Sequence, residues 1–465
     1  MQFDTVLTNA QVRLADQGPA DVGITDGRVA AIAPGLSGQA SGQLIDCGGR
    51  LLLPGFIDAH NHPYYEEDIQ QFSASAAAGG ITTLLSFAGI SGRTVNPAAS
   101  PAAVAATAQR GPGTLDTARD FIDYATDTSC LDVGVHAILT AADVDDMRTI
   151  PALRELGVRS FKLFMAFPGT RMVDDGRLLH AMQQIAALDG LCMVHCENGD
   201  AIARLEAALQ ADGRRGMQDY IDSRPPELEA EAINRAITLA GIARCPLYVV
   251  HVSTARGLDF IRQARNSGGQ TVYAETSPHF LLLTAADQLA LGHQAKISPP
   301  MRSRDDIDAL WAGIRDGVID VIASDASGQC LPAKQAAGPD AFAAPFGLPG
   351  VTEMVPLVLD EASRRGVPMR RVLDCLTAGP AQIFGIGDRK GSLQVGGDAD
   401  LVLYDQRERW EVPAIPRPGG ITDYSLYAGR AVTGRPVMSF SRGDTLLAAP
   451  GTPVRVAPHR YLRRT

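Results

Sequence analysis

Short apolar segments rich in β-branched and aromatic residues recur through the middle of the chain, and stretches with helical periodicity separate them. Two of those stretches, 175–188 and 227–240, combine strong helix formers with apolar residues at helical spacing. Strands that alternate with helices predict an α/β fold with a parallel sheet, and eight strands are the number that closes a (β/α)8 TIM barrel. The expected strands are 51–60, 81–87, 133–139, 158–164, 191–195, 247–251, 271–275 and 318–324.

The two ends of the chain have a different pattern. Residues 1–53 alternate apolar and polar positions in short runs, and Asp26-Gly27 between two of these runs is a strong hairpin signal. A similar alternation of apolar and polar residues returns at 391–404, where a Gly-Gly-Asp sequence separates two β-rich segments. The simplest arrangement pairs the two ends into one β-sandwich that flanks the central region.

These patterns divide the chain into three parts. We expect a β-sandwich domain from 1–53 and 391–448, a barrel from 54–390 and a C-terminal tail at 449–465. Two segments rich in Ala, Pro and Gly, 96–113 and 330–350, are expected to be long loops that cover a site.

Composition and net charge indicate which partners and which cellular compartment to expect. The chain has 465 residues, 45% of them hydrophobic, which is ample for a large core. A formal net charge of -10 provides no basic field, so we expect no nucleic acid and no anionic membrane as partner. The N-terminus lacks the pattern of a signal peptide, and no run reaches the roughly 18 apolar residues of a membrane span. We therefore expect a soluble, cytoplasmic protein.

The seven cysteines include no C-x-x-C pair, which favours reduced thiols over a disulfide framework. Cys192 and Cys196 flank His195, so a Cys/His zinc site is one interpretation. The other is that both are small buried residues beside a strand, and this second interpretation is preferred.

The segment Gly55–His62 places two histidines one residue apart just after an apolar run. In a strand, side chains alternate between faces, so His60 and His62 point to one side and Asn61 to the other. Two ligands of one metal can therefore come from one strand end. Two solvated loop histidines are the alternative, and further ligands at comparable positions are needed to exclude it.

Such residues stand at the carboxyl ends of the other expected strands. Lys162 lies in the fourth strand, His195 ends the fifth, His251 ends the sixth, and Asp325 follows the eighth. Each has an ordinary explanation by itself; Asp325, for example, could cap a helix. Because a barrel of this kind carries its chemistry at that rim, their coincidence predicts a metal site.

Lys162 is cationic at its usual pKa and then has no lone pair to offer a metal. Its strand is flanked by apolar residues, and desolvation there would lower the pKa of the amine. The neutral amine can add carbon dioxide to form a carbamate, whose two oxygens are able to bridge two metals.

Across essentially its whole length the chain resembles the cyclic amidohydrolases of the amidohydrolase superfamily, close to hydantoinase and dihydropyrimidinase. The motifs that carry the resemblance are Gly55-Phe-Ile-Asp-Ala-His-Asn-His62, Phe161-Lys-Leu-Phe-Met-Ala166, Val194-His-Cys-Glu-Asn198, Val250-His-Val-Ser253, Glu275-Thr-Ser-Pro-His279, Ser298-Pro-Pro-Met-Arg302 and Ala323-Ser-Asp325.

The resemblance implies a binuclear centre. His60, His62 and Asp325 would hold one divalent ion, His195 and His251 the other, and carboxylated Lys162 would bridge them. Zinc is favoured by imidazole and carboxylate ligands, and manganese, iron or cobalt stay open. Relatives are often tetramers or dimers, so a homo-oligomer is expected.

The implied reaction is hydrolysis of a cyclic amide C–N bond. Two ions that share a water lower its pKa and polarise the carbonyl that it attacks. Asp325 would take the proton of that water and pass it to the leaving nitrogen. In such relatives, main-chain groups near Ser298 and at about Phe346 and Gly347 hold the ring amide.

The chain departs from these relatives beside the expected site. Hydantoinases carry a Tyr at the position of Phe167, where the phenol donates a hydrogen bond to the oxyanion. Ala326-Ser327-Gly328 follows Asp325 where the family often continues with His, and the loop after His62 begins Pro63-Tyr64-Tyr65. Tyr64, Tyr65 and Phe167 suggest an aromatic-lined pocket, although simple packing explains them about as well.

Two alternatives stay open. A dihydroorotase- or allantoinase-like enzyme is one, although the residues after His62 offer no Arg to clamp the carboxylate of dihydroorotate. A catalytically silent scaffold is the other; the complete set of expected ligands argues against it, and the missing Tyr favours it. The substrate that fits best is a hydantoin-like ring, cyclic imide or lactam with an uncommon substituent.

Overall fold

The computed structural model of the protein describes residues 2–12, 20–89, 113–417, 420–454 and 459–464. The expected loop at 96–113 lies outside these residues apart from Gly113.

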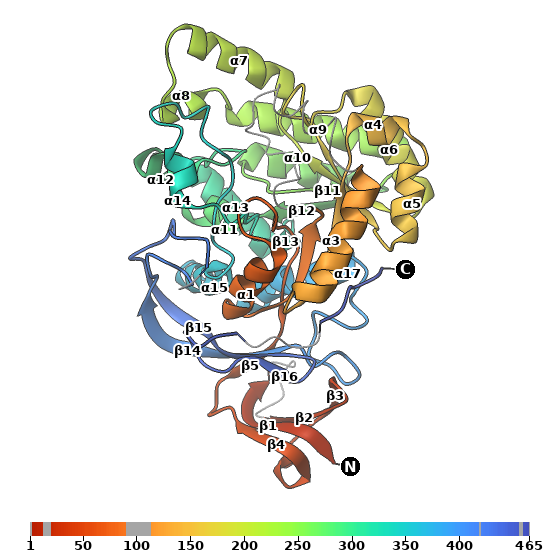
Figure 1. The fold of residues 1–465 in the computed structure, drawn as a ribbon, viewed down its shortest axis with the longest axis vertical. Coiled ribbons are helices and arrows are strands. Elements are labelled where there is room, and N and C mark those ends of the chain that lie inside the picture. The colour runs from red at the N-terminus through yellow and green to blue at the C-terminus, as the bar shows by residue number, and fades with distance from the viewer. Residues whose placement is uncertain (1, 13–19, 90–112, 418–419, 455–458, 465) are drawn as a thin grey trace.

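Eight parallel strands form one sheet in strict sequence order, from β6 to β13, with helices around it (Figure 1). All seven residues of β7 and all seven of β8 are buried, as expected for strands covered on both faces. The predicted α/β barrel is therefore confirmed. Its strands are β6 (Phe56–Asp58), β7 (Ile81–Phe87), β8 (Asp132–Ile138), β9 (Ser160–Phe164), β10 (Leu191–His195), β11 (Leu247–Val249), β12 (Val272–Thr276) and β13 (Val321–Ile322).

The expected first strand, 51–60, is wrong as a single element. Leu51–Pro54 forms β5 of the terminal domain, and only Phe56–Asp58 enters the barrel. Gly55 joins the two, and a Cβ there would come within 2.1 Å of Thr82 Oγ1. The chain passes from one domain to the other where only glycine fits.

The barrel closes between its first and last strands just beyond their ends. Asn61 and Ala326 form a parallel bridge, and the backbone N–H of Asp325 donates to the carbonyl of His60 at 2.8 Å. Asp58 accepts from the backbone N–H of Ser324 at 2.9 Å. The segments that carry His60, His62 and Asp325 are therefore fixed to each other.

The two predicted helices are confirmed as α6 and α9. Helix ends carry the expected signals; α13, for example, begins with a Ser303–Asp306 capping box and ends at left-handed Gly317. The helices are α1 (Ile69–Ala78), α3 (Thr114–Thr128), α4 (Ala141–Asp145), α5 (Thr149–Glu155), α6 (Asp175–Ala187), α7 (Gly199–Ala211), α8 (Met217–Asp222), α9 (Pro226–Ala243), α10 (Ala255–Asn266), α11 (Pro278–Leu282), α12 (Ala285–Leu291), α13 (Arg304–Asp316), α14 (Leu331–Gln335), α15 (Met354–Arg364), α16 (Met369–Leu376) and α17 (Ala378–Ile383).

Both ends of the chain build a second, mixed sheet below the barrel in Figure 1, as predicted. Its path runs β16-β15-β14-β5-β1-β2-β3, and β4 also pairs with β1. The hairpin at Asp26-Gly27 is present, and both residues have positive φ. The strands are β1 (Phe3–Val12), β2 (Ala20–Thr25), β3 (Arg28–Ala33), β4 (Ala40–Asp46), β5, β14 (Leu401–Glu411), β15 (Ala431–Ser441) and β16 (Asp444–Leu447).

One part of that pattern is wrong. Residues 391–395 precede the Gly-Gly-Asp turn but form no strand. The turn itself replaces a strand contact, because Gly396 N–H donates to Val29 O at 2.8 Å and Val29 N–H donates to Gly397 O at 3.0 Å.

Candidate metal centre and its cavity

The side chains of His60, His62 and Asp325 converge at the carboxyl-end rim of the barrel. His60 Nε2 lies 3.2 Å from His62 Nε2 and 3.0 Å from Asp325 Oδ1. His62 Nε2 lies 3.2 Å from the same Asp325 oxygen. Asn61 points the other way and donates to Asp58, so the predicted alternation of faces is confirmed although no regular strand extends to His62.

This donor set fits a divalent metal. Four ligand atoms about 2.0–2.1 Å from zinc in a tetrahedron lie roughly 3.3 Å from one another. The three donor atoms here are 3.0 to 3.2 Å apart and comprise two imidazole nitrogens and a carboxylate oxygen. Chemistry and spacing therefore both suit the ion that the sequence predicts.

Three of the histidines each have one ring nitrogen hydrogen-bonded to a neighbouring side chain, which leaves the second nitrogen for a metal. His60 Nδ1 lies 2.6 Å from Glu275 Oε1, and His62 Nδ1 lies 2.8 Å from the hydroxyl of Tyr64. His195 Nε2 lies 2.7 Å from Glu197 Oε2, which leaves Nδ1 for a ligand role. Partners of this kind orient metal-binding imidazoles and set their tautomers.

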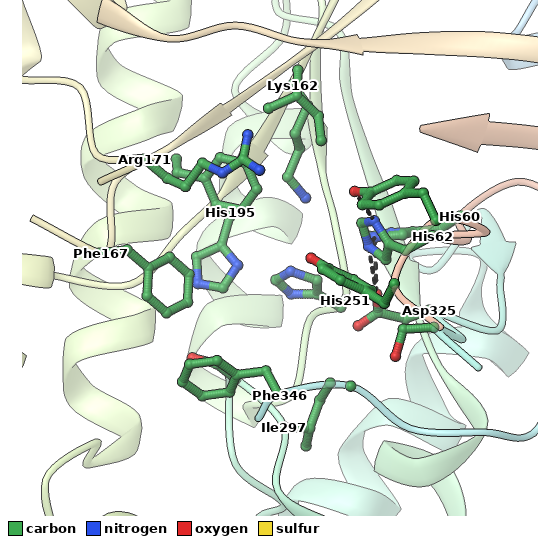
Figure 2. A pocket seen from close by; sticks show the side chains of 17 residues that line it. His60, His62, Lys162, Phe167, Arg171, His195, His251, Ile297, Asp325 and Phe346 are labelled. Atoms are coloured by element: carbon green, nitrogen blue, oxygen red, sulfur yellow. Dashed lines mark hydrogen bonds and ion pairs between the residues drawn. The ribbon is translucent and has the colours of Figure 1, made fainter. Parts of the chain in front are cut away.

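His195 and His251 complete the rim beside the first three ligands. Their ring centroids are 4.7 Å apart, and His251 lies 5.6 Å from His60. Lys162 Nζ projects into the same space, 5.1 Å from the centroid of Phe164. The structure thus brings all six predicted ligands to one cavity, shown in Figure 2. Their roles as ligands stay predictions.

The histidines and the carboxylate of this group shift one another's pKa values. Burial disfavours charged His60, but Glu275 and Asp325 outweigh burial and raise its pKa to about 9. Burial likewise disfavours an ionised Asp325, but His60 and His62 hold its pKa well below the usual range. Burial lowers the pKa of His62 to about 4. The site therefore presents an ionised carboxylate, the neutral imidazole of His62, and a proton on His60 that a metal ion bound to its Nε2 would displace.

Lys162 behaves as its sequence context predicts. Burial lowers its pKa to about 8, although Asp325 and Glu275 oppose that shift. A substantial neutral fraction near pH 8 is what carbamate formation requires.

The cavity beside this centre has a volume of about 70 Å³, several times the roughly 10–15 Å³ that one water needs by this measure. Its walls are mostly aromatic and aliphatic apart from the candidate ligands, with a few polar side chains from Arg171, Ser298 and Ser327, which suits a small ring. The residues predicted to contact substrate all line it: Tyr64, Tyr65, Phe167, Ser298, Phe346 and Gly347. The segment 330–350 lines the site through Phe346 and Gly347, as expected. It is not a loop throughout, because Leu331–Gln335 forms α14.

Several lining residues were not predicted from the sequence. Arg171 places a guanidinium in the wall, close enough to oppose the effect of burial on the pKa of Tyr65. Ser327, Ile138, Phe164 and Ile297 also line the cavity. Only the position of Ser327, two residues after Asp325, carries a signal in the sequence.

Glu275 and Glu197 were not predicted as partners of the histidines either. Both lie within motifs that carry the family resemblance: Glu275 is in β12, and Glu197 follows His195 by two residues. An acidic residue buried at a strand end is the signal that identifies such a partner.

The backbone is unusual at three positions of the site. Phe167, His251 and Asp325 have φ of 65°, 38° and 50°. Residues with a side chain seldom occupy this left-handed region, and such conformations cluster at functional sites.

The cysteines near His195 behave as the preferred interpretation predicts. Cys192 and Cys196 are buried, and burial raises the pKa of both thiols. In the part of the chain that the structure describes, the group of metal-ligating donors consists of His60, His62 and Asp325 and includes neither cysteine. All seven cysteines are free thiols.

Among the described helices, none combines the length and apolar character that a membrane crossing needs.

Known proteins resemble this chain over nearly its whole length. The amidohydrolase family matches residues 51–446. A D-hydantoinase of Streptomyces coelicolor is 34% identical and spans 96% of this chain and 95% of its own. An allantoinase of Rubrobacter xylanophilus is also 34% identical and spans 96% and 94%. The solved structure of an L-hydantoinase (dihydropyrimidinase) from Arthrobacter aurescens superposes with a TM-score of 0.89 at 30% identity, covering 100% of both chains.

The family match, the identity to hydantoinases and the fold agree with the histidine-rich rim of the barrel. The chain belongs to the amidohydrolase family and is an enzyme of its hydantoinase type, a hydrolase that acts on cyclic amides.

Proposed function

We propose that this enzyme opens a hydantoin, a dihydropyrimidine or a related cyclic imide by hydrolysis of a ring C–N bond. The observation that carries the proposal is the convergence of His60, His62 and Asp325 on one point of the barrel rim, beside a small cavity. The ring-opened product is a carbamoyl or amide acid.

We further propose two divalent ions, zinc before manganese, iron or cobalt. His60, His62 and Asp325 would hold one, His195 and His251 the other, and Lys162 as a carbamate would lie between them. Bound there, the ions supply Lewis acidity toward the ring carbonyl and toward an attacking water. The lowered pKa of Lys162 and the 3.0 to 3.2 Å spacing of the first three donors support this assignment.

Asp325 is the proposed proton carrier. As the new C–O bond forms at the ring carbonyl, its carboxylate accepts a proton from the attacking water and delivers it to the ring nitrogen as the C–N bond breaks. The neighbouring histidines keep its pKa low, so it is ionised before the water attacks. Main-chain groups at Ser298, Phe346 and Gly347 would orient the ring amide, and the aromatic wall would exclude bulk water.

The test is a screen of the metal-reconstituted protein against hydantoins, dihydropyrimidines, cyclic imides and lactams, with Asp325→Asn beside the wild type. We expect turnover of one ring class and its near abolition in Asp325→Asn, with metal still bound. Asp320→Asn is the matched control, because Asp320 binds Arg265 near the opposite end of the same strand. Equal turnover in the wild type and Asp325→Asn would refute the role of Asp325.

Two other substrates belong in the same screen. The allantoinase relative is as similar in identity as the D-hydantoinase, so allantoin is the second candidate. Arg171 adds a cation to the cavity wall, which supports testing dihydroorotate as well. A catalytically silent scaffold would open no ring even with its metals bound; the complete ligand set argues against it.

A further inference from the structure

Four side chains that line the cavity carry hydroxyl groups, and three of these hydroxyls have partners. Tyr64 OH lies 2.8 Å from His62 Nδ1, and Tyr64 and Tyr65 also hydrogen-bond each other. Ser298 Oγ donates to Glu197 Oε2 at 2.5 Å. Ser327 is only 1% exposed, yet its Oγ makes no hydrogen bond within the described residues.

A buried hydroxyl without a partner is unfavourable, and one in a cavity wall points to a partner supplied from outside the chain. Ser327 follows the proposed proton carrier by two residues, and its backbone N–H is fixed to Leu348 O at 3.0 Å. Its Oγ lies against Gly347, where a Cβ would come within 1.9 Å of it. The hydroxyl therefore contacts the backbone proposed to hold the ring amide, on the same short segment as Asp325.

Hydrolysis of an amide needs a donor for the negative charge that builds on the carbonyl oxygen. Phe167, whose ring lies 5.3 Å from that of His195, has no such group. Phe167 and Ser327 both line the same cavity. A donor at Ser327 can therefore serve a ring that is bound beside Phe167.

We propose that Ser327 Oγ donates a hydrogen bond to the ring carbonyl under attack and so replaces the phenol that Phe167 lacks. This inference rests on the proposed function. Rotation about the Cα–Cβ bond between staggered positions, with a freely turning O–H, lets the hydroxyl follow the oxygen as its geometry changes. The bond strengthens as charge develops, so its effect falls on kcat rather than on KM.

The first experiment compares Ser327→Ala with the wild type on the ring that the screen identifies. We expect kcat to fall about 100-fold with KM within about twofold and with metal content unchanged. Ser439→Ala is the matched control: Ser439 is fully buried and its Oγ is also unpartnered, but it lies in β15 of the terminal domain. Ser327→Cys keeps a weak donor on a slightly larger side chain and should fall between Ser and Ala in kcat.

The second experiment restores a donor at position 167. Phe167→Tyr should raise kcat at least tenfold more in the Ser327→Ala background than in the wild type. In that background the ring carbonyl oxygen has lost its donor, and the new phenol supplies one. A wild type that opens no ring overturns the proposed function. If the wild type is active, three results would refute the role of Ser327 and leave the proposed function standing. These are a Ser327→Ala variant that behaves like Ser439→Ala, one in which only KM changes, and one that shows no coupling to position 167.

Discussion

Tyr64 connects the loop after the first barrel strand to the candidate metal centre. Its hydroxyl lies 2.8 Å from His62 Nδ1, and its ring meets that of His62 edge-on with centroids 5.7 Å apart. It is only 2% exposed, so water does not readily replace the hydroxyl. Tyr64 therefore orients a proposed ligand as well as lining the pocket.

Tyr64→Phe should weaken metal binding by about 10- to 100-fold, because His62 loses the partner that fixes its ring and tautomer. The dissociation constant for zinc, measured by competition with a chelator, checks this. Tyr220→Phe is the control, since it also removes a buried tyrosine hydroxyl, but one that donates to the carbonyl of Ile297 at 2.7 Å. Equal affinities for both variants would contradict the role.

Individual residues also show where sequence reasoning ends. His60, His62, Lys162, His195, His251 and Asp325 could be placed on one rim because strand order in a barrel determines which ends meet. Arg171 could not, because its position depends on the path of an irregular segment after β9, for which periodicity gives no rule. The unpartnered state of Ser327 is likewise a property of its neighbours in space.

At the level of elements, strands were predicted better than their connections. The strand positions follow from continuous apolar runs, but the break between β5 and β6 at Gly55 depends on Thr82, which lies in a different strand. Residues 391–395 look β-rich, yet the Gly-Gly-Asp turn beside them makes the contacts with β3 instead. Contacts with residues far away in the sequence decide where these two strands break or fail to form, and a local sequence pattern holds no information about such contacts.

Glu353 directly precedes α15, where its side chain makes no capping hydrogen bond, and its burial leads to a prediction about pH. It is 2% exposed, Ser425 Oγ donates to it at 2.7 Å, and its Oε2 has no partner among the described residues. Burial raises its pKa from 4.5 to about 7. Between those values the folded protein holds the proton and the unfolded chain does not, so this group makes stability fall as pH rises through that window.

Glu353→Gln removes this dependence while keeping the size and the hydrogen-bonding oxygen. Relative to the wild type, the variant should gain about 2 to 3 kcal/mol of unfolding free energy between pH 5 and pH 8. Urea unfolding at the two pH values measures the difference. A constant difference between wild type and variant across that range would show that Glu353 titrates normally.

On the scale of the whole molecule, a buried charge cluster joins the barrel to the terminal domain. Lys390 Nζ lies 2.7 Å from Asp132 at the start of β8, 3.0 Å from Asp398 and 2.5 Å from Asp400 just before β14. Arg442, after β15, also pairs with Asp132. The C-terminal segment adds to the same face, since Arg460 N–H donates to Asp132 at 2.8 Å. Segments far apart in sequence thus meet at one carboxylate.

Lys390→Met should destabilise the protein by about 3 to 5 kcal/mol, because it leaves three buried carboxylates without their shared cation. Denaturant unfolding measures this, with Arg389→Met as the control: Arg389 pairs with Asp398 at 2.8 Å, but its side chain is 29% exposed, so its loss should cost about 1 kcal/mol or less. The effect of Lys390→Met should shrink as pH falls toward 4, because the isolated carboxylates then take up protons and lose their charge. Destabilisation equal to that of Arg389→Met at every pH would mean that the junction is held by its apolar contacts and not by this cluster.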